Sequence, residues 1–192
     1  ETLGHVHFGI NYLNNPDSYR LGQRVIVIGA GNAAMDVART AVRKGAREVV
    51  CFSRTSSVAA SRHEFDYASL EGVTFLYNKA PVEIVDEGVI FEDVVEQPGG
   101  MFAHVEGSRA LYPADSVIIS ISQGPRNRIV NTTKGIEVNA RGLLVTDEEG
   151  RTTRPGVFAS GDVVNGARTV VEAVEHSKHV AEAMDAYMRD LS

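Results

Sequence analysis

A glycine-rich segment at residues 24–36, RVIVIGAGNAAMD, constrains the fold of this chain more than any other stretch. An apolar run ends at Gly29 and Gly31, and a run of small residues follows. This order of strand, tight turn and helix is typical of dinucleotide-binding α/β domains. Gly29 permits the sharp turn, Gly31 lets backbone approach a pyrophosphate, and Ala34 lets the helix pack closely on the strand. The segment therefore predicts a Rossmann-like domain.

The start of the predicted helix supports the same interpretation. The first backbone N–H groups of a helix have no intrahelical partner, and the helix dipole is positive there, so phosphate oxygens are favoured. A glycine turn with a purely structural role is the alternative. The strand before the turn and the helix after it, which we expect to end before Gly45, favour nucleotide binding.

The end of the next strand decides between NAD and NADP. Residues 48–52 read as a second parallel strand, and Ser53 and Arg54 follow it. A carboxylate usually holds the ribose 2′-hydroxyl of NAD at this place, about 20 residues beyond the glycines. Here no carboxylate is present to repel a 2′-phosphate, and the Arg54 guanidinium can bind one. This favours NADP, with Arg62 or His63 as a second contact, whereas a solvated Arg54 is the alternative.

Beyond this unit the pattern of apolar residues changes. Residues 62–71 read as a helix, whereas residues 81–112 carry short strands separated by turns, which indicates an antiparallel meander. The buried run 116–122 is a candidate for the last parallel strand. The final third holds RPGVFASGD at 154–162, read as a turn, a short strand and a Gly–Asp pair, and then a long helix capped by Thr169. One apolar stripe of that helix needs a partner surface: Val170, Val174, Ala181, Met184, Tyr187 or Met188, and Leu191.

Composition excludes several classes of function. The formal net charge is -6 and no basic run occurs, so a nucleic-acid partner is not expected. The only cysteine, Cys51, excludes an internal disulfide and a cysteine-bound iron–sulfur cluster, and it suits the reducing cytoplasm. No signal peptide and no apolar run long enough for a membrane are found. Because the chain starts at Glu1, we expect an excised or processed piece of a longer protein.

Motifs for other chemistries are absent from the sequence. A single cysteine excludes a CxxC disulfide relay, and neither YxxxK of short-chain dehydrogenases nor GxSxG of hydrolases occurs. His176 and His179 have the spacing of a ligand pair, but they fall on the charged side of their helix, where a solvated face is expected. We therefore predict neither a metal site nor a catalytic side chain.

Three ordered motifs together resemble the pyridine-nucleotide-dependent FAD oxidoreductases. They are RVIVIGAGNAAMDVARTAVRKGA, the later SISQGP, and GVFASGDVVNGARTVVEAVEHSKHVAEAM, and the resemblance covers nearly the whole chain. The nearest branch is the small (beta) subunit of glutamate synthase and its relatives, which include the corresponding part of dihydropyrimidine dehydrogenase. The resemblance implies an oxidoreductase that passes hydride from NADPH to FAD, and then electrons to an iron–sulfur or flavin partner.

The resemblance also implies a division into domains. In this family a three-layer (ββα) Rossmann-like NADPH domain with an antiparallel meander is inserted into an FAD domain. Here that gives an FAD-domain lead-in at 1–21, the NADP-binding domain at 22–125, and a C-terminal strand–helix segment of the FAD domain at 126–192.

The cofactor-binding residues that the resemblance implies fall into two groups. The NADP group lies at the glycine turn and the next strand end: Gly29, Gly31, Asn32, Ala34, Ser53 and Arg54. The FAD group follows the Gly–Asp pair: Gly161, Asp162, Thr169, Val170 and Val171. Asp162 would hold a ribityl hydroxyl, and the helix N-terminus would face the flavin edge that gains negative charge on reduction. A turn or capping aspartate is the alternative for Asp162.

Two departures from the family pattern matter. The family usually carries paired arginines after the second strand, and here Ser53 takes the first place, which weakens the NADP preference. The family's FAD domain also begins with a glycine-rich turn of its own, and this chain has only one such turn. We therefore expect a fragment that is inactive, and binds FAD weakly or not at all, without an upstream FAD-domain segment.

A second class of function stays open. A non-catalytic module that senses pyridine nucleotide, or serves as a scaffold, would bind nucleotide without transferring hydride. The Gly–Asp pair and the long helix favour the oxidoreductase, because a sensor would not need them.

Overall fold

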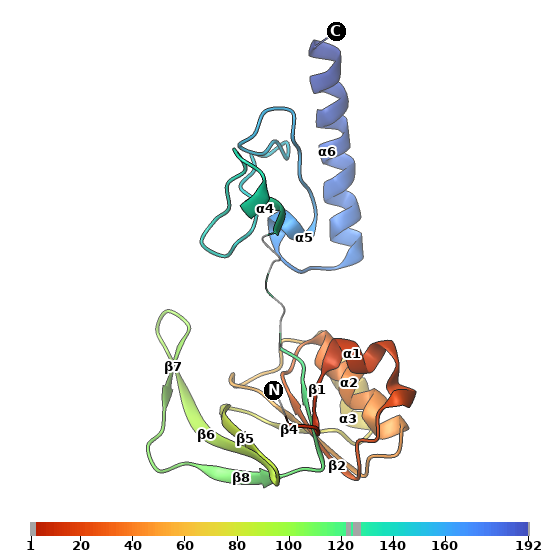
Figure 1. Ribbon diagram of the computed structural model, residues 1–192, viewed down its shortest axis with the longest axis vertical. Helices are drawn as coiled ribbons and strands as arrows, with labels where there is room; N and C mark the ends of the chain where they lie inside the picture. The colour runs from red at the N-terminus through yellow and green to blue at the C-terminus, as the bar shows by residue number, and fades with distance from the viewer. Residues whose placement is uncertain (1–2, 122–123, 125–127, 192) are drawn as a thin grey trace. The chain divides into compact units, whose positions relative to one another are not determined.

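The computed structural model describes residues 3–121, 124 and 128–191 of the chain (Figure 1). They form two compact units, residues 1–122 and 123–192, and each is described by itself. The first unit contains β1 (Val6–Phe8), α1 (Gly9–Asn14), β2 (Arg24–Ile28), α2 (Asn32–Arg43), β3 (Glu48–Phe52), α3 (Arg62–Leu70), β4 (Thr74–Leu76), β5 (Lys79–Val85), β6 (Gly88–Gln97), β7 (Met101–His104), β8 (Ala110–Pro113) and β9 (Ser116–Ile119). The second contains α4 (Arg128–Thr132), α5 (Asp162–Asn165) and α6 (Val170–Asp190).

The first unit contains two sheets. Within the described residues, one sheet is wholly parallel in the order β1-β9-β2-β3-β4, and the other is antiparallel in the order β5-β6-β7, with β8 also paired to β6. The four residues of β2 from Val25 to Ile28 are all buried. A continuous apolar strand of this kind is what a sheet covered on both faces requires.

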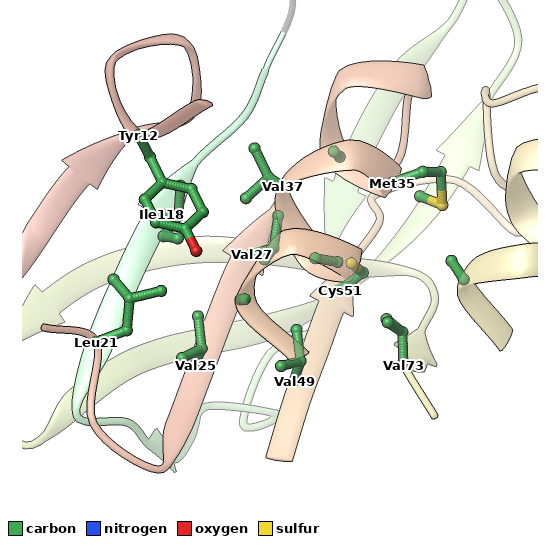
Figure 2. Close-up of a cluster of buried hydrophobic side chains, with 14 residues drawn as sticks. Tyr12, Leu21, Val25, Val27, Met35, Val37, Val49, Cys51, Val73 and Ile118 are labelled. Carbon is green, nitrogen blue, oxygen red and sulfur yellow. The ribbon is translucent and has the colours of Figure 1, made fainter. Parts of the chain in front are cut away.

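Alternating side chains of β2 explain the three layers of the first unit. Val25 and Val27 belong to the core between the parallel sheet and the helices (Figure 2). Ile26 faces the other way and packs in a second core with Phe91 of the antiparallel sheet. The Phe91 ring stacks on Phe52 of β3, with ring centroids 3.8 Å apart. The expected α/β fold, with an antiparallel layer, a parallel layer and a helical layer, is confirmed.

Most expected elements of this unit are present. α2 ends at Arg43, and Gly45 beyond it has a left-handed φ of +100°. The meander expected at 81–112 corresponds to β5 to β8. β9 covers the first residues of the strand expected at 116–122. Ser122, Gln123 and Pro125 of the SISQGP motif lie outside the described residues.

Residues 6–8 are part of the parallel sheet. β1 is the edge strand and pairs with β9, where Val6 lies opposite Val117. α1 packs on α2, and the Tyr12 side chain is fully buried in the helix-side core. Residues 6–14 therefore complete the sheet and its helical layer.

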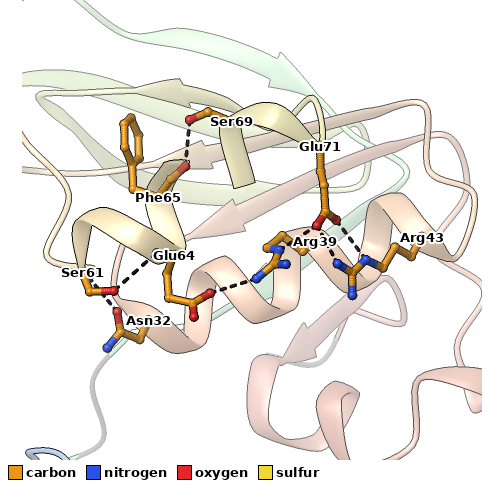
Figure 3. Close-up of polar contacts among 8 residues, drawn as sticks. All are labelled: Asn32, Arg39, Arg43, Ser61, Glu64, Phe65, Ser69 and Glu71. Carbon is orange, nitrogen blue, oxygen red and sulfur yellow. Dashed lines mark hydrogen bonds and ion pairs between the residues drawn. The ribbon is translucent and has the colours of Figure 1, made fainter. Parts of the chain in front are cut away.

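A cluster of charged side chains holds α2 and α3 together (Figure 3). The Arg39 guanidinium donates hydrogen bonds to Glu64 and Glu71 at 2.9 and 3.0 Å, and Arg43 donates to the same Glu71 carboxylate. Arg39 and Glu71 are largely shielded from water, with side chains 17% and 23% exposed. Hydrogen bonds from Arg43, and then from Arg39, hold the pKa of Glu71 below its ordinary value.

Replacing Glu71 with glutamine is expected to lower the free energy of unfolding by about 1 kcal/mol at neutral pH. Because the folded-state pKa of Glu71 lies below its ordinary value of 4.5, its contribution is complete above that pH and is lost as pH falls through the folded pKa. Urea unfolding of wild type and Glu71→Gln should therefore converge at acidic pH. Asp66→Asn, which removes the exposed Arg62–Asp66 pair, is the control and should have little effect at any pH. If the loss of unfolding free energy in Glu71→Gln does not vary with pH, the stabilisation does not come from the ionised Glu71 carboxylate.

The second unit is built along one long helix. α6 begins at a capping box, in which Thr169 Oγ1 accepts from the Glu172 N–H and the Glu172 carboxylate accepts from the Thr169 N–H. The strand expected within 154–162 is reduced to a single bridge between Arg151 and Phe158. The described residues of this unit contain only isolated bridges, so no ladder extends that pairing.

The apolar stripe that the sequence predicts on α6 is not the face that packs. The face turned toward the rest of the unit carries Ala173, His176, Val180, Ala183 and Tyr187. Tyr187, one of two alternatives for the stripe, packs edge-on against Phe158. The side chains of the stripe are exposed by 41–79%: Val170, Val174, Met184, Met188 and Leu191. Within the described part of this unit, the expected partner surface for the stripe is absent.

No helix among the described residues combines the length and the apolar character that crossing a bilayer needs.

Candidate functional site

The glycine turn lies at the point where the strand order of the parallel sheet reverses. From β2 the chain moves outward through β3 and β4, and it later returns to the other side of β2 as β9. Ligands of open α/β sheets bind at the carboxyl ends of the strands beside such a switch point. The turn therefore stands where a nucleotide site is expected.

Gly29 makes the turn possible through its backbone. Its φ is +131°, a region that residues with a side chain rarely adopt, and its N–H donates to the Phe52 carbonyl at 3.0 Å. A Cβ at this position would lie 2.3 Å from the carbonyl oxygen of Ser120, just after β9. The turn is thus packed directly between β3 and the end of β9.

Gly31 differs from Gly29, because space is open beside it. A Cβ at Gly31 would meet no atom of the structure within 4 Å, and its φ of -90° is ordinary. Gly31 is the N-cap of α2, which has no capping side chain and no acidic residue in its first turn. Ala34, one turn on, is fully buried against the sheet. Open space at an uncapped helix N-terminus fits an anionic ligand.

A loop from residue 53 to residue 61 rests on the glycine turn. The N–H groups of Ala59 and Ala60 donate to the Ala30 carbonyl at 2.9 and 3.0 Å. The Ser61 N–H donates to the side-chain oxygen of Asn32 at 2.8 Å (Figure 3). The Asn32 side chain is therefore engaged by the loop, and a ligand can meet this residue through its backbone N–H.

Ser53 supports the loop from beneath. Its side chain is buried, and its hydroxyl shares a hydrogen bond of 2.8 Å with Thr55 Oγ1 and donates to the Ser57 carbonyl at 3.2 Å. The hydroxyl of Ser53 is thus committed within the protein. Its structural role is to shape the loop that carries Arg54.

Arg54 is exposed at the end of β3, and its guanidinium lies over the ring of Phe102. Among the described residues, no carboxylate forms an ion pair with it. Of the two residues suggested as a second contact, Arg62 pairs with Asp66 and His63 packs edge-on against Tyr67. Arg54 is accordingly the cation of this loop that remains available.

The second unit contains a separate cleft of about 580 Å³ along the start of α6. Four of the five residues expected on the flavin side line it: Gly161, Asp162, Thr169 and Val170. Val171 follows on α6 with its side chain 76% exposed and is not part of the lining. The Thr169 N–H donates to Glu172, so the open N–H groups of this helix start are those of Val170 and Val171.

His176 has a role that the sequence did not indicate. Its Nδ1 accepts a hydrogen bond from the Gly161 N–H at 3.1 Å, and Asn165 Nδ2 lies 3.0 Å from the same nitrogen. Because a backbone N–H can only donate, Nδ1 is unprotonated in this arrangement. The solvated face expected for His176 and His179 therefore holds for His179 alone, and His176 fixes the turn at Gly161. Among the described residues no group of side chains is arranged to hold a metal ion.

Cys51 behaves as a core residue. Its side chain is buried within the helix-side core, and burial raises the pKa of the thiol to about 12. Thiolate chemistry is excluded at this position, since the reactive form is not populated near neutral pH.

The chain is similar in sequence and structure to several known proteins. Residues 3–177 match the family model described as pyridine nucleotide-disulphide oxidoreductase. The glutamate synthase [NADPH] small chain of Halomonas elongata is 36% identical, over 98% of this chain and 46% of the relative. The NADP(+)-dependent formate dehydrogenase subunit beta of Moorella thermoacetica is 36% identical, over 88% of this chain and 25% of the relative. The crystal structure of T. acidophilum thioredoxin reductase shares the fold, with a TM-score of 0.74 at 21% identity over 98% of this chain and 58% of that one. This chain therefore spans less than half the length of either curated relative.

Proposed function

The chain belongs to the pyridine nucleotide-disulphide oxidoreductase family, and from this premise we propose that it is the NADPH-binding portion of an FAD-dependent oxidoreductase similar to the glutamate synthase small chain. The observation that carries the proposal is the open space beside Gly31 at the uncapped start of α2, with Arg54 at the end of the next strand. The open start of a helix suits a pyrophosphate, and an arginine at the next strand end suits a 2′-phosphate.

In the first unit, backbone N–H groups at Gly31 and Asn32 would bind the pyrophosphate at the start of α2. Gly29 and Ala34 would shape the turn and bring the helix close to the sheet. The Arg54 guanidinium would bind the 2′-phosphate through two parallel N–H groups, a geometry that lysine cannot offer. This unit would thus orient the nicotinamide nucleotide by its phosphates.

In the second unit, the cleft at α6 would hold the flavin. The carboxylate of Asp162 would accept a hydrogen bond from a ribityl hydroxyl, and Gly161 would keep the backbone beside it free of side chains. The N–H groups of Val170 and Val171 and the positive end of the α6 dipole would stabilise negative charge on the ligand. When bound, FAD supplies the acceptor for hydride from NADPH. The cleft favours this function over a nucleotide sensor, which would not need it.

The rest of the proposal concerns the whole protein. We assign the NADP-binding role to residues 22–125 and the FAD-domain role to residues 126–192, with an upstream FAD-domain segment completing the flavin site. Electrons would pass on to an iron–sulfur or flavin partner in the cytoplasm. The Moorella thermoacetica relative is itself named as a subunit, which supports a partner. The chain would contribute position and electrostatics rather than a catalytic side chain.

Calorimetric titration of the chain with NADPH and with NADH tests the proposal. The wild type is expected to prefer NADPH, and Arg54→Ala should weaken NADPH binding roughly 10- to 100-fold, because a charge-assisted pair contributes about 1.5–3 kcal/mol. NADH binding should change little in the same variant.

Arg47→Ala is the matched control, since Arg47 is also exposed but precedes β3 at the opposite end of the strand. It should retain the preference. Equal affinity of the wild type for the two nucleotides would remove the role assigned to Arg54, and absence of binding to both would overturn the assignment of the glycine turn.

A further inference from the structure

The guanidinium of Arg54 rests on an aromatic ring from a distant part of the chain. Its Cζ atom lies 5.0 Å from the centroid of Phe102, which belongs to β7. This distance is within the range of cation–π attraction. Among the described residues, the Phe102 ring is the one partner recorded for the Arg54 side chain.

A contact of this kind leaves the guanidinium able to bind a ligand. The Cζ atom lies over the face of the ring, and the ring carries no oxygen or nitrogen that would accept hydrogen bonds from the guanidinium. An arginine held over an aromatic ring therefore keeps N–H donors for a phosphate. Holding the side chain in advance also reduces the entropy that an exposed arginine loses when it binds.

Hydrogen bonds, an ion pair and strand pairing connect the loop that carries Arg54 to the strand that carries Phe102. The Lys79 N–H donates to the Ser53 carbonyl at 2.9 Å, and Lys79 Nζ pairs with Asp93 of β6 at 2.5 Å. β6 in turn pairs with β7, where Glu96 lies opposite Phe102.

A second link follows the same route. The Asn78 N–H donates to the Thr55 carbonyl at 3.3 Å, and the Asn78 carbonyl accepts from the Val94 N–H at 2.9 Å. The loop that carries Arg54 and the hairpin that carries Phe102 are thus joined through residues 78 and 79.

We propose that Phe102 is a positioning residue for NADP specificity, which holds the Arg54 guanidinium over its ring so that the N–H donors meet the 2′-phosphate. This inference rests on the proposed function of the first unit. It assigns part of the selection for the 2′-phosphate to the antiparallel sheet, outside the strand–turn–helix unit that carries the rest of the nucleotide site.

The test compares 2′,5′-ADP with 5′-AMP, two probes that differ in the 2′-phosphate alone, by titration calorimetry on the full chain. Phe102→Leu keeps an apolar side chain and removes the aromatic face. It should reduce the preference for 2′,5′-ADP about two- to five-fold, the effect of a cation–π contact at an exposed site. Binding of 5′-AMP and the melting temperature should stay unchanged, and Phe102→Tyr, which keeps the ring, should retain the preference.

Met101→Ala is the matched control, since Met101 is 69% exposed on the other face of the same strand. It should behave as wild type. A loss of affinity for both probes in Phe102→Leu would mean a merely structural role and overturn the inference. So would an unchanged preference in Phe102→Leu when Arg54→Ala abolishes it, although the proposed function would then stand. A wild type that does not distinguish the two probes would overturn both.

Discussion

Replacing Gly29 with alanine is expected to destabilise the first unit by roughly 3 kcal/mol or more, because overpacking and backbone strain act together. The new Cβ would lie 2.3 Å from the Ser120 carbonyl oxygen, and neither backbone segment can yield without breaking strand pairing. The residue would also have to hold a φ of +131°. Urea unfolding followed by tyrosine absorbance measures this unit, since Tyr187 is the sole tyrosine outside it.

Gly31→Ala is the informative companion variant. A Cβ there meets open space at an ordinary φ, so the unit should fold with a stability close to that of wild type. The methyl group would instead occupy the place proposed for the pyrophosphate, and nucleotide binding should weaken. If Gly29→Ala proves as stable as Gly31→Ala, the close approach to Ser120 does not exist in solution.

Replacing Phe91 with alanine is expected to cost about 3–5 kcal/mol of unfolding free energy. Phe91 is fully buried, stacks on Phe52 at an interplanar angle of 9° and meets Tyr112 edge-on. Phe91 and Phe52 are the two phenylalanines of the core between the two sheets, so the loss of Phe91 would leave a cavity that rigid strands on both sides cannot close. Urea unfolding monitored by circular dichroism gives the free energy.

Two further variants calibrate that measurement. Phe91→Leu keeps much of the volume and should cost less than Phe91→Ala. Met101→Ala removes a side chain that is 69% exposed and should change the stability by less than about 0.5 kcal/mol. A Phe91→Ala protein as stable as Met101→Ala would show that the contact between the sheets contributes little.

Local patterns account for the parts of the fold that were predicted correctly. The apolar run before Gly29, the small residues after it and Gly45 at the helix end are each read from neighbouring positions. The ending of α2 and the parallel pairing of β2 with β3 agree with that interpretation. Strong short-range signals of this kind need no knowledge of distant residues.

Features that depend on distant residues could not be predicted. β1 pairs with β9, from the far end of the first unit, and nothing in its three residues identifies that partner. The same holds for the face of α6 that packs. The sequence shows its apolar stripe, but Val180, which is not part of that stripe, is the residue that packs beside Gly150.

The candidate site shows the same division. Motifs indicate Gly31, Arg54 and Asp162 as candidates, whereas no motif indicates the buried hydroxyl of Ser53 or the contact between His176 and Gly161. The sequence also gives no signal for Phe102, because the role proposed for it depends on a contact with Arg54, which lies far away in the chain.

The contact between Gly29 and Ser120 also affects the order of events during synthesis and folding. Gly29 follows the second strand of the first unit, and Ser120 follows its last strand, with the whole antiparallel sheet between them in the sequence. Contacts between residues so far apart in the sequence form slowly, since the long intervening loop must first close. A nascent chain that has not yet extended beyond β9 therefore contains the complete glycine motif but lacks the Ser120 backbone against which Gly29 packs. We therefore expect the proposed nucleotide site to form late, when the strand at the end of the unit has paired beside β2.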